Sequence, residues 1–393
     1  MALAQSAPAS SAASTSASAS GKRGTPVRVL VVDDSAVIRG LVKRWLDEAE
    51  GIEVAGSASN GQLAVAEAGK IDPDVVILDI EMPVMDGLTA LPGILKASPG
   101  VKIIMASTLT LRNAEISLKA LSLGATDYVP KPDSARGIAG SDEFRRELLD
   151  KVLALGTVRQ AQAGRPRTRA ASVVQAAPRA VPAAPAAKAP IVLRQPSSVP
   201  PRILAVGSST GGPQALFALF EEIGPKLKRL PVVIAQHMPA SFTRIMAEKL
   251  GKVSGLVACE GADGQRLEAG HLYVAPGDHH MRVARDGTGA KITLDQSPPV
   301  HFCRPSVDPL FESVAGVYGP SVLAVVLTGM GHDGRDGGRM IADQGGTVLA
   351  QDEETSVVWG MPGACAQAGI CAGVYPLPRM GGEIGRIIGG ARA

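Results

Sequence analysis

The sequence predicts an α/β protein in which two domains, each built on a parallel sheet, are joined by a linker. Short uninterrupted apolar segments alternate with helical patterns over residues 26–155 and again over residues 201–393. Such apolar segments are typical of strands that are covered on both faces of a parallel sheet. Residues 156–200 are instead rich in Ala, Pro and Arg, a composition that buries too little apolar surface to fold alone.

In the first domain, apolar strands are predicted at residues 27–32, 74–80, 101–107 and 126–129. A helix is predicted over residues 35–49, with Ser35 as its cap, because apolar residues recur there at helical spacing. A last helix is predicted near residues 142–155. This alternation predicts a doubly wound unit.

The second domain repeats the alternation with different lengths. Strands are predicted at residues 202–206, 231–236, 271–276, 321–329 and 346–351. Helices are predicted at residues 213–223, 241–250, 306–317 and 334–344. The pattern therefore predicts a second doubly wound, mostly parallel domain.

Composition excludes several classes of protein. The net charge of +3 and the aromatic content of 3% argue against a nucleic-acid partner. No uninterrupted apolar run approaches the ~18 residues that cross a bilayer, so direct membrane insertion is not expected. Residues 1–25 are rich in Ala and Ser and lack the features of a signal peptide, so we expect a disordered tail and a cytoplasmic protein. The cysteines (Cys259, Cys303, Cys365 and Cys371) lack CxxC spacing and are expected to be reduced thiols.

Acidic residues, a hydroxyl and a lysine follow the predicted strands of the first domain. Asp33 and Asp34 follow one strand, Asp79 ends another, and Ser107 and Lys131 end two more. Because carboxyl ends of parallel strands share one edge of a sheet, these side chains are expected to converge. Three carboxylates repel one another unless a cation such as Mg²⁺, which prefers oxygen ligands, lies between them. We therefore predict an Mg²⁺ site at which Asp79 attacks a phosphorus atom and becomes an aspartyl phosphate.

The segments VLVVDDSAVIRGLV, LDIEMPVMDGLTAL, IIMAST and GATDYVPKP resemble the response-regulator receiver domain. The resemblance covers nearly all of residues 27–150 and implies a flavodoxin-like fold with a five-stranded parallel sheet. It implies that Asp79 is the phosphoacceptor, that Asp33 and Asp34 bind Mg²⁺, and that a histidine kinase is the phosphodonor. It also implies that Lys131 contacts the phosphate and that Ser107, rather than the adjacent Thr108, is the switch hydroxyl.

The second domain contains a candidate nucleophile in the segment VGSSTGG, residues 206–212, between a strand and a helix. The segment matches neither G-x-G-x-x-G nor a P-loop, although a helix start after glycines can bind phosphate. It fits G-x-S-x-G, in which small residues permit a sharp turn that exposes the central hydroxyl. This favours Ser209 over Ser208 as the nucleophile, with amides near Thr210 as oxyanion donors.

A serine nucleophile needs a base, and histidine is the usual one. Ser209 follows one predicted strand, and His237 directly follows the next strand along the chain. The two residues are therefore expected at the same edge of the sheet. His271 begins a strand and belongs to the opposite edge, while His279 and His280 lie in a polar turn and are expected to face solvent. His301 and His332 are harder to exclude, because His332 also ends a strand, but His237 is the first candidate, ahead of His332.

The imidazole also needs a carboxylate that fixes its orientation. The best candidate is Asp333 in LTGMGHDGRDGG, which follows a strongly apolar strand, and Asp336 in the same loop is second. The amide of Met330 in this glycine-rich loop is a further oxyanion candidate.

The segments VGSSTGGPQAL, IAQHMPASFT, HLYVAPGDHHM, CRPSVDPLFESVA and VLTGMGHDG together resemble the catalytic domain of chemotaxis receptor methylesterases, from about residue 201 to 385. The resemblance implies that Ser209, His237 and Asp333 form a catalytic triad that needs no cofactor. It implies a phosphorylation-activated serine hydrolase of two-component signalling that demethylates glutamate methyl esters on methyl-accepting chemotaxis receptors, releasing methanol, and that deamidates glutamines. The alternative is a response regulator with a non-catalytic or nucleotide-binding output domain.

Overall fold

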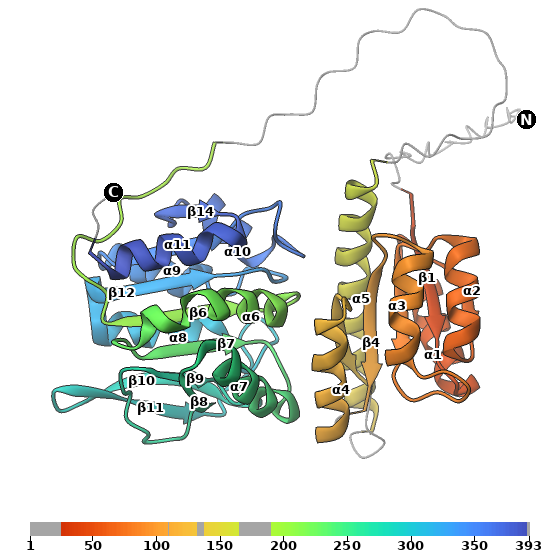
Figure 1. Ribbon diagram of the computed structural model, residues 1–393, viewed down its shortest axis with the longest axis horizontal. Coiled ribbons are helices and arrows are strands. Elements are labelled where there is room, and N and C mark those ends of the chain that lie inside the picture. The colour runs from red at the N-terminus through yellow and green to blue at the C-terminus, as the bar shows by residue number, and fades with distance from the viewer. Residues whose placement is uncertain (1–24, 109, 132–136, 165–189, 391–393) are drawn as a thin grey trace, which may run out of the picture.

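The computed structural model describes residues 25–108, 110–131, 137–164 and 190–390, which form two α/β domains (Figure 1). The predicted tail lies outside these ranges except for its last residue, and so does most of the predicted linker. None of the helices in the described ranges is long and apolar enough to cross a membrane.

The first domain contains a five-stranded sheet with the order β2-β1-β3-β4-β5, in which all neighbours are parallel. The strands are β1 (Val27–Val32), β2 (Ile52–Ala58), β3 (Val75–Asp79), β4 (Lys102–Ser107) and β5 (Asp127–Pro130). The predicted fold class is confirmed, and the predicted strands match β1, β3, β4 and β5. Strand β2 was not among the predicted segments, because only its end residues Ile52 and Ala58 are buried.

Helices α1 (Ala36–Asp47), α2 (Gly61–Ile71), α3 (Gly87–Ala97), α4 (Leu111–Ser122) and α5 (Gly137–Gln162) cover this sheet. Ser35 caps α1 as predicted, since its hydroxyl accepts the Ile38 N–H at 3.4 Å. The last helix is longer than the predicted residues 142–155, because α5 continues to Gln162. The last turns are held by Gln160, whose Nε2 donates to Asp74 Oδ2 at 2.8 Å.

The second domain contains a seven-stranded parallel sheet with the order β14-β13-β12-β6-β7-β9-β8. Its strands are β6 (Ile203–Ser208), β7 (Val232–Gln236), β8 (Val257–Glu260), β9 (His271–Val274), β12 (Val322–Val326), β13 (Thr347–Gln351) and β14 (Gly373–Tyr375). An antiparallel hairpin, β10 (His280–Asp286) and β11 (Gly289–Asp295), stands apart from the sheet. The helices are α6 (Gly212–Ile223), α7 (Ala240–Ser254), α8 (Val307–Tyr318), α9 (Arg335–Asp343), α10 (Met361–Gln367) and α11 (Leu377–Ile388). The predicted doubly wound, mostly parallel fold is confirmed.

The winding of this sheet reverses at β6, which pairs with β7 on one side and with β12 on the other. All residues of these three strands are buried. In doubly wound sheets ligands bind beyond the carboxyl ends of the strands at such a reversal. The ends of β6, β7 and β12 are therefore where a site is expected.

The end of the predicted linker packs against the second domain. The Arg194 amide donates to Cys371 O at 2.8 Å, and its guanidinium pairs with Asp343 at 2.8 Å. The Ser197 amide donates to Thr347 Oγ1 at 2.9 Å. These residues of the predicted linker are therefore attached to the second domain by hydrogen bonds.

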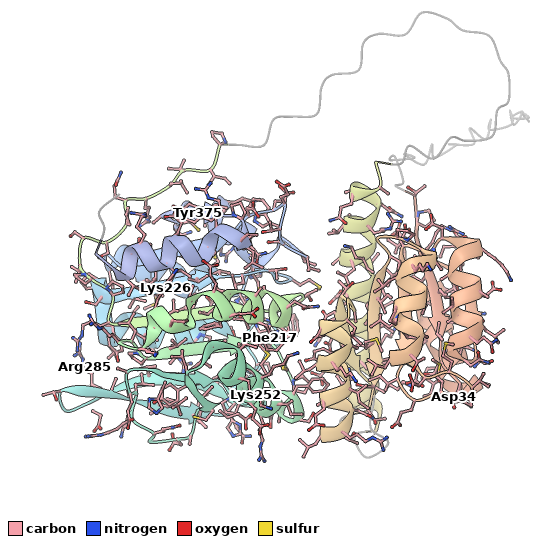
Figure 2. All side chains as sticks on the ribbon, viewed as in Figure 1. Asp34, Phe217, Lys226, Lys252, Arg285 and Tyr375 are labelled. Atoms are coloured by element: carbon pink, nitrogen blue, oxygen red, sulfur yellow. The ribbon has the colours of Figure 1, made fainter. Side chains whose placement is uncertain are left out.

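The two domains meet where α4 and α5 face the side of the second domain formed by α6 and α7 (Figure 1). Gln214 Nε2 of α6 donates to Ala125 O of the first domain at 2.8 Å. Lys249 of α7 donates to Ser122 Oγ of α4 and lies over the Phe217 ring, 4.3 Å from its centroid. Figure 2 shows Phe217 on the side of the second domain that faces the first. Hydrogen bonds thus join the two domains.

Candidate active site

The turn after β6 separates its two serines. The Ser208 side chain is fully buried, and its hydroxyl donates to Gln236 Oε1 at 2.6 Å. Ser209 is half-buried, and its amide donates to Thr328 O at 3.0 Å. Gly211 has a φ of 75°, a left-handed conformation that favours glycine, and α6 begins at the next residue. The turn therefore leaves Ser209, and not Ser208, partly accessible at the end of the strand.

His237 and Asp333 meet beside this turn. His237 Nε2 lies 2.7 Å from Asp333 Oδ2. The two residues follow β7 and β12, the neighbours of β6, so the sheet order brings them together as the sequence predicted.

Asp333 is held in place by several donors. Its Oδ2 accepts the Ser306 hydroxyl at 2.8 Å and the Val307 amide at 2.7 Å, and its Oδ1 accepts the Asp308 amide at 2.9 Å. Burial alone would raise the pKa of this carboxyl, but the His237 ring and the backbone donors hold the pKa well below its usual range. Asp333 therefore stays ionised and orients the imidazole.

The other nitrogen of His237 contacts a thiol. Cys303 Sγ lies 3.2 Å from His237 Nδ1. Burial would lower the pKa of His237, but Cys303 and Asp333 on either side of the ring raise it to about 10. Within the described ranges, no hydrogen bond joins the Ser209 hydroxyl to His237. The structure thus brings two of the three predicted catalytic residues together and places a cysteine where the serine was expected.

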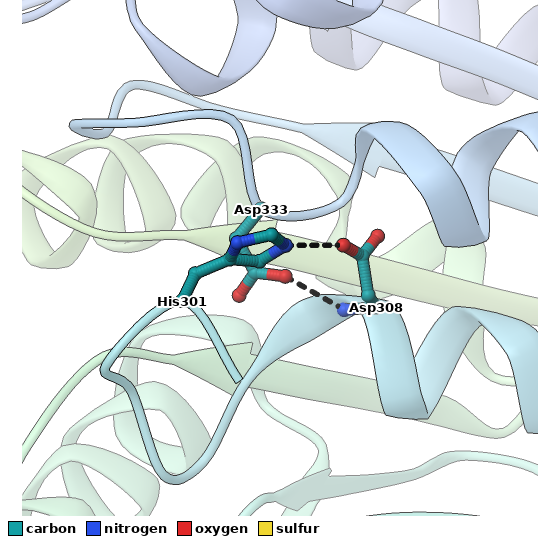
Figure 3. Close-up of side chains that lie close together, drawn as sticks. All are labelled: His301, Asp308 and Asp333. Atoms are coloured by element: carbon teal, nitrogen blue, oxygen red, sulfur yellow. Dashed lines mark hydrogen bonds and ion pairs between the residues drawn. The ribbon is translucent and has the colours of Figure 1, made fainter. Parts of the chain in front are cut away.

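A second histidine–aspartate pair, His301 and Asp308, lies beside Asp333 (Figure 3). His301 Nε2 lies 3.0 Å from Asp308 Oδ2, while Asp308 Oδ1 accepts the Gly337 amide at 2.7 Å. Burial, together with the charge of Asp333, raises the pKa of Asp308 to about 6. Polar atoms of His301, Asp308 and Asp333 lie within 4.8 Å of one another. A metal ion does not fit this group, because both Asp333 oxygens already accept protein N–H or O–H donors.

The backbone beside Ser209 offers free donors. In the part of the chain that the structure describes, the amides of Thr210 and Met330 donate to no protein acceptor. A Cβ added at Gly329 would lie 2.9 Å from Ser209 Cβ, so the loop before Met330 packs tightly against the serine turn. The two amides were the oxyanion candidates, and their roles remain predictions.

The remaining candidates lie elsewhere. His332 is exposed and packs edge-on against His301, with ring centroids 4.3 Å apart, and Asp336 is exposed and pairs with Arg335 at 2.9 Å. His271 begins β9, at the opposite edge of the sheet, as predicted. The expectation that His280 faces solvent was wrong. It is fully buried, and its Nδ1 accepts the Ser306 amide at 3.3 Å.

The acidic residues of the first domain converge at the carboxyl edge of its sheet. Asp33 and Asp79 are buried, Asp34 is exposed, and ligand oxygens of all three lie within 4.8 Å of one another. Lys131 Nζ lies 2.7 Å from Asp33 Oδ2 and 2.7 Å from Asp79 Oδ1. Burial raises the pKa of Asp79 although Lys131 lowers it, and the two carboxylates raise the pKa of Lys131 against the effect of burial. This set of hard oxygen donors suits Mg²⁺.

The two candidate switch hydroxyls differ in burial. The Ser107 side chain is buried, and its Oγ lies 3.2 Å from Ser117 Oγ of α4. Thr108 is exposed, and its Oγ1 accepts Asn113 Nδ2 at 2.7 Å. Each hydroxyl therefore contacts α4, the helix at the domain interface.

Comparison with known proteins matches both domains. Residues 204–384 match the family described as CheB methylesterase, and residues 29–139 match the response regulator receiver domain. A protein-glutamate methylesterase/protein-glutamine glutaminase of Paramagnetospirillum magneticum is 53% identical over 90% of this chain and 94% of its own length. A protein of the same description from Rhodospirillum rubrum is 54% identical over 92% of this chain and 95% of its own length. The crystal structure of the Thermotoga maritima CheB methylesterase catalytic domain is 36% identical and aligns with 48% of this chain and 100% of its own, with a TM-score of 0.46.

Proposed function

The chain belongs to the CheB methylesterase family, and on that premise we propose that it is a phosphorylation-activated serine hydrolase of two-component signalling. Its substrates are glutamate methyl esters on chemotaxis receptors. The observation that carries the proposal is the contact between the half-buried His237 and the buried Asp333, 2.7 Å apart, beside the Ser209 turn. The alternative was a second domain that is a non-catalytic or nucleotide-binding output domain. This alternative is not favoured, because the relatives are named as enzymes.

In the first half-reaction, Ser209 Oγ attacks the ester carbonyl carbon and its proton passes to His237 Nδ1. Nδ1 is the nitrogen for this step because Nε2 is bound to Asp333. His237 then returns the proton to the methoxy oxygen, the carbon–oxygen bond breaks, and methanol leaves an acyl-enzyme. The negative charge on the carbonyl oxygen is stabilised by the Thr210 and Met330 amides.

In the second half-reaction, His237 takes a proton from water as the water oxygen attacks the acyl carbon. The bond to Ser209 Oγ then breaks, the serine regains a proton from His237, and the receptor glutamate is left as a carboxylate. A glutamine side chain passes through the same two steps with ammonia as the leaving group. The site therefore also supports deamidation of glutamine, the second activity in the names of the relatives.

Asp79 is the proposed phosphoacceptor of the receiver domain, with a histidine kinase as phosphodonor. Asp33, Asp34 and Asp79 would hold Mg²⁺, which neutralises charge on the phosphoryl group during transfer. Lys131, already 2.7 Å from Asp79, is placed to contact the phosphoryl oxygens once the aspartate is modified. The switch hydroxyl of Ser107 contacts α4 and couples the modified site to the interface helix.

Control of the esterase rests on the contact between the domains. Val357 packs against the serine turn, since a Cβ added at Gly211 would lie 2.5 Å from the Val357 side chain. Val357 also packs against the core of the receiver. We expect phosphorylation to shift the population from this docked form to one with an accessible Ser209. We propose the cytoplasm as the site of action.

The test is methanol release from membranes that carry methylated receptor, with and without a small phosphodonor. The proposal predicts a slow basal rate and a faster rate after phosphorylation. Absence of methanol release under both conditions would argue against the enzyme activity. An equal rate under both conditions would argue against control by the receiver.

A further inference from the structure

We propose that Cys303 is a positioning residue. In the form in which the receiver packs against the catalytic domain, the Cys303 thiol binds His237 Nδ1, and this nitrogen then cannot accept the Ser209 proton. The inference rests on the proposed function, since it concerns the base of that same reaction. It assigns a role to a residue for which the sequence predicted only a reduced thiol.

The two nitrogens of the His237 imidazole face different partners. Asp333 is ionised and accepts only, so His237 Nε2, 2.7 Å away, must carry the proton of that hydrogen bond. In the neutral ring the lone pair is then on Nδ1. Cys303 Sγ lies 3.2 Å from this nitrogen. The thiol therefore occupies the one position that can accept the Ser209 proton.

Transfer of the Cys303 proton to His237 Nδ1 would also leave this nitrogen unable to accept the Ser209 proton. If the S–H bond breaks and an N–H bond forms at Nδ1, an imidazolium ion lies between a thiolate and a carboxylate. A pKa of about 10 for His237 agrees with this stabilisation of the charged ring. In either protonation state, Nδ1 has no free lone pair for Ser209.

The segment that carries Cys303 is held in an uncommon conformation. His301 and Phe302 have φ values of 50° and 62°, a left-handed region that non-glycine residues seldom adopt. Such conformations persist where the surroundings hold them, and they are frequent at functional sites. Within the second domain, His301 is held by Asp308, whose Oδ2 lies 3.0 Å from His301 Nε2.

The receiver holds the same segment from the other side. The Phe302 side chain is 72% exposed, yet its ring lies 4.3 Å from the Arg146 guanidinium carbon of α5. Phe302 adjoins Cys303, so a movement of α5 that withdraws Arg146 removes a contact one residue from the thiol. We therefore expect displacement of the receiver to release the segment and free His237 Nδ1 for Ser209.

The first test compares full-length Cys303→Ala and Cys303→Ser with the wild type in methanol release. Without phosphodonor, the alanine variant is expected to be at least fivefold faster than wild type. Its activation by phosphodonor should be smaller by a similar factor. The serine variant, which can still donate to Nδ1, should lie between them. Rates at or below wild type in the alanine variant, with its unfolding temperature unchanged, would overturn the proposal.

The pH profile separates this role from a merely structural one. Removal of the thiol lowers the pKa of His237, so the fraction of neutral base rises at lower pH. The rising limb of the unphosphorylated rate should therefore move to lower pH in Cys303→Ala. A loss of packing alone would change the rate without moving this limb.

The second test does not depend on esterase activity. In a Cys259→Ser background the other described cysteines are buried, which leaves Cys303 as the accessible thiol. We expect beryllofluoride with Mg²⁺, as a phosphoryl analogue, to increase the rate of alkylation of Cys303 by iodoacetamide at least threefold. Asp79→Asn in the same background should abolish the increase. If alkylation is equally fast with and without the analogue, the thiol is not released and the proposal fails even if the enzyme is active.

Discussion

The Tyr128 ring of the receiver stacks on the Phe242 ring of the catalytic domain, with centroids 4.3 Å apart and planes inclined by 11°. Both rings are buried, so β5 and the start of α7 share a dry contact. Figure 2 places Asp34 of the proposed phosphorylation site on the side of the receiver away from the catalytic domain. We therefore expect phosphorylation to act on the proposed catalytic residues through the receiver fold and this interface, not by direct contact.

Weakening the interface should raise the basal rate. In Lys249→Ala the α7 side chain loses its hydrogen bond to Ser122 and its contact with the Phe217 ring. A hydrogen bond contributes about 1 kcal/mol, so a small open population should grow by about fivefold. The measurement is methanol release without phosphodonor. Lys252→Ala on the exposed face of the same helix is the matched control and should leave the rate unchanged.

Phosphorylation should require the acidic cluster and Mg²⁺ but basal hydrolysis should not. Asp79→Asn is expected to abolish both incorporation of phosphate and activation by phosphodonor, because the attacking carboxylate oxygen is lost. Chelation of Mg²⁺ should likewise abolish phosphorylation of the wild type while the basal rate persists. Activation of the Asp79→Asn variant to the wild-type level would contradict the assignment.

Replacing the carboxylate behind His237 should inactivate the enzyme. Asp333→Asn can place an amide N–H toward the imidazole and so favour the wrong tautomer, which costs about 10⁴-fold in kcat in a serine protease triad. We expect a loss of this order in methanol release. Asp336→Asn removes an exposed partner of Arg335 in the same loop and should retain nearly full activity. Similar losses of activity in both variants would mean that disturbance of the loop, and not loss of the Asp333 carboxylate, inactivates the enzyme.

The buried Asp308 should give the protein a measurable pH dependence of stability. Its pKa rises from 3.8 to about 6 on folding, because of burial and the nearby Asp333 charge. A raised pKa means that the group contributes stability below pH 3.8 which is lost as the pH rises through about 6. Asp308→Asn does not titrate. Urea unfolding from about pH 4 to 7 should therefore show the wild type losing stability relative to the variant, whereas a constant difference would contradict the shift.

The strands that the sequence predicted are those whose side chains are buried on both faces, such as β6 and β12. Strand β8 was missed because Val257 is exposed and its other residues are only half-buried, so no apolar run marks it. The meeting of His237 and Asp333 could be predicted because they follow β7 and β12, the strands on either side of β6, and strand order alone brings such residues together. The contact of Cys303 with His237 could not, because it joins residues 66 apart in sequence through a loop in an uncommon conformation.

We expect the half-buried hydroxyl of Ser209 to perform the chemistry. The most direct measurement is methanol release from methylated receptor membranes by Ser209→Ala and by Ser208→Ala, each with phosphodonor. Ser209→Ala should fall to the background rate, whereas Ser208→Ala, which loses only a buried hydrogen bond to Gln236, should stay within a few-fold of wild type. Undiminished methanol release by folded Ser209→Ala would contradict the account.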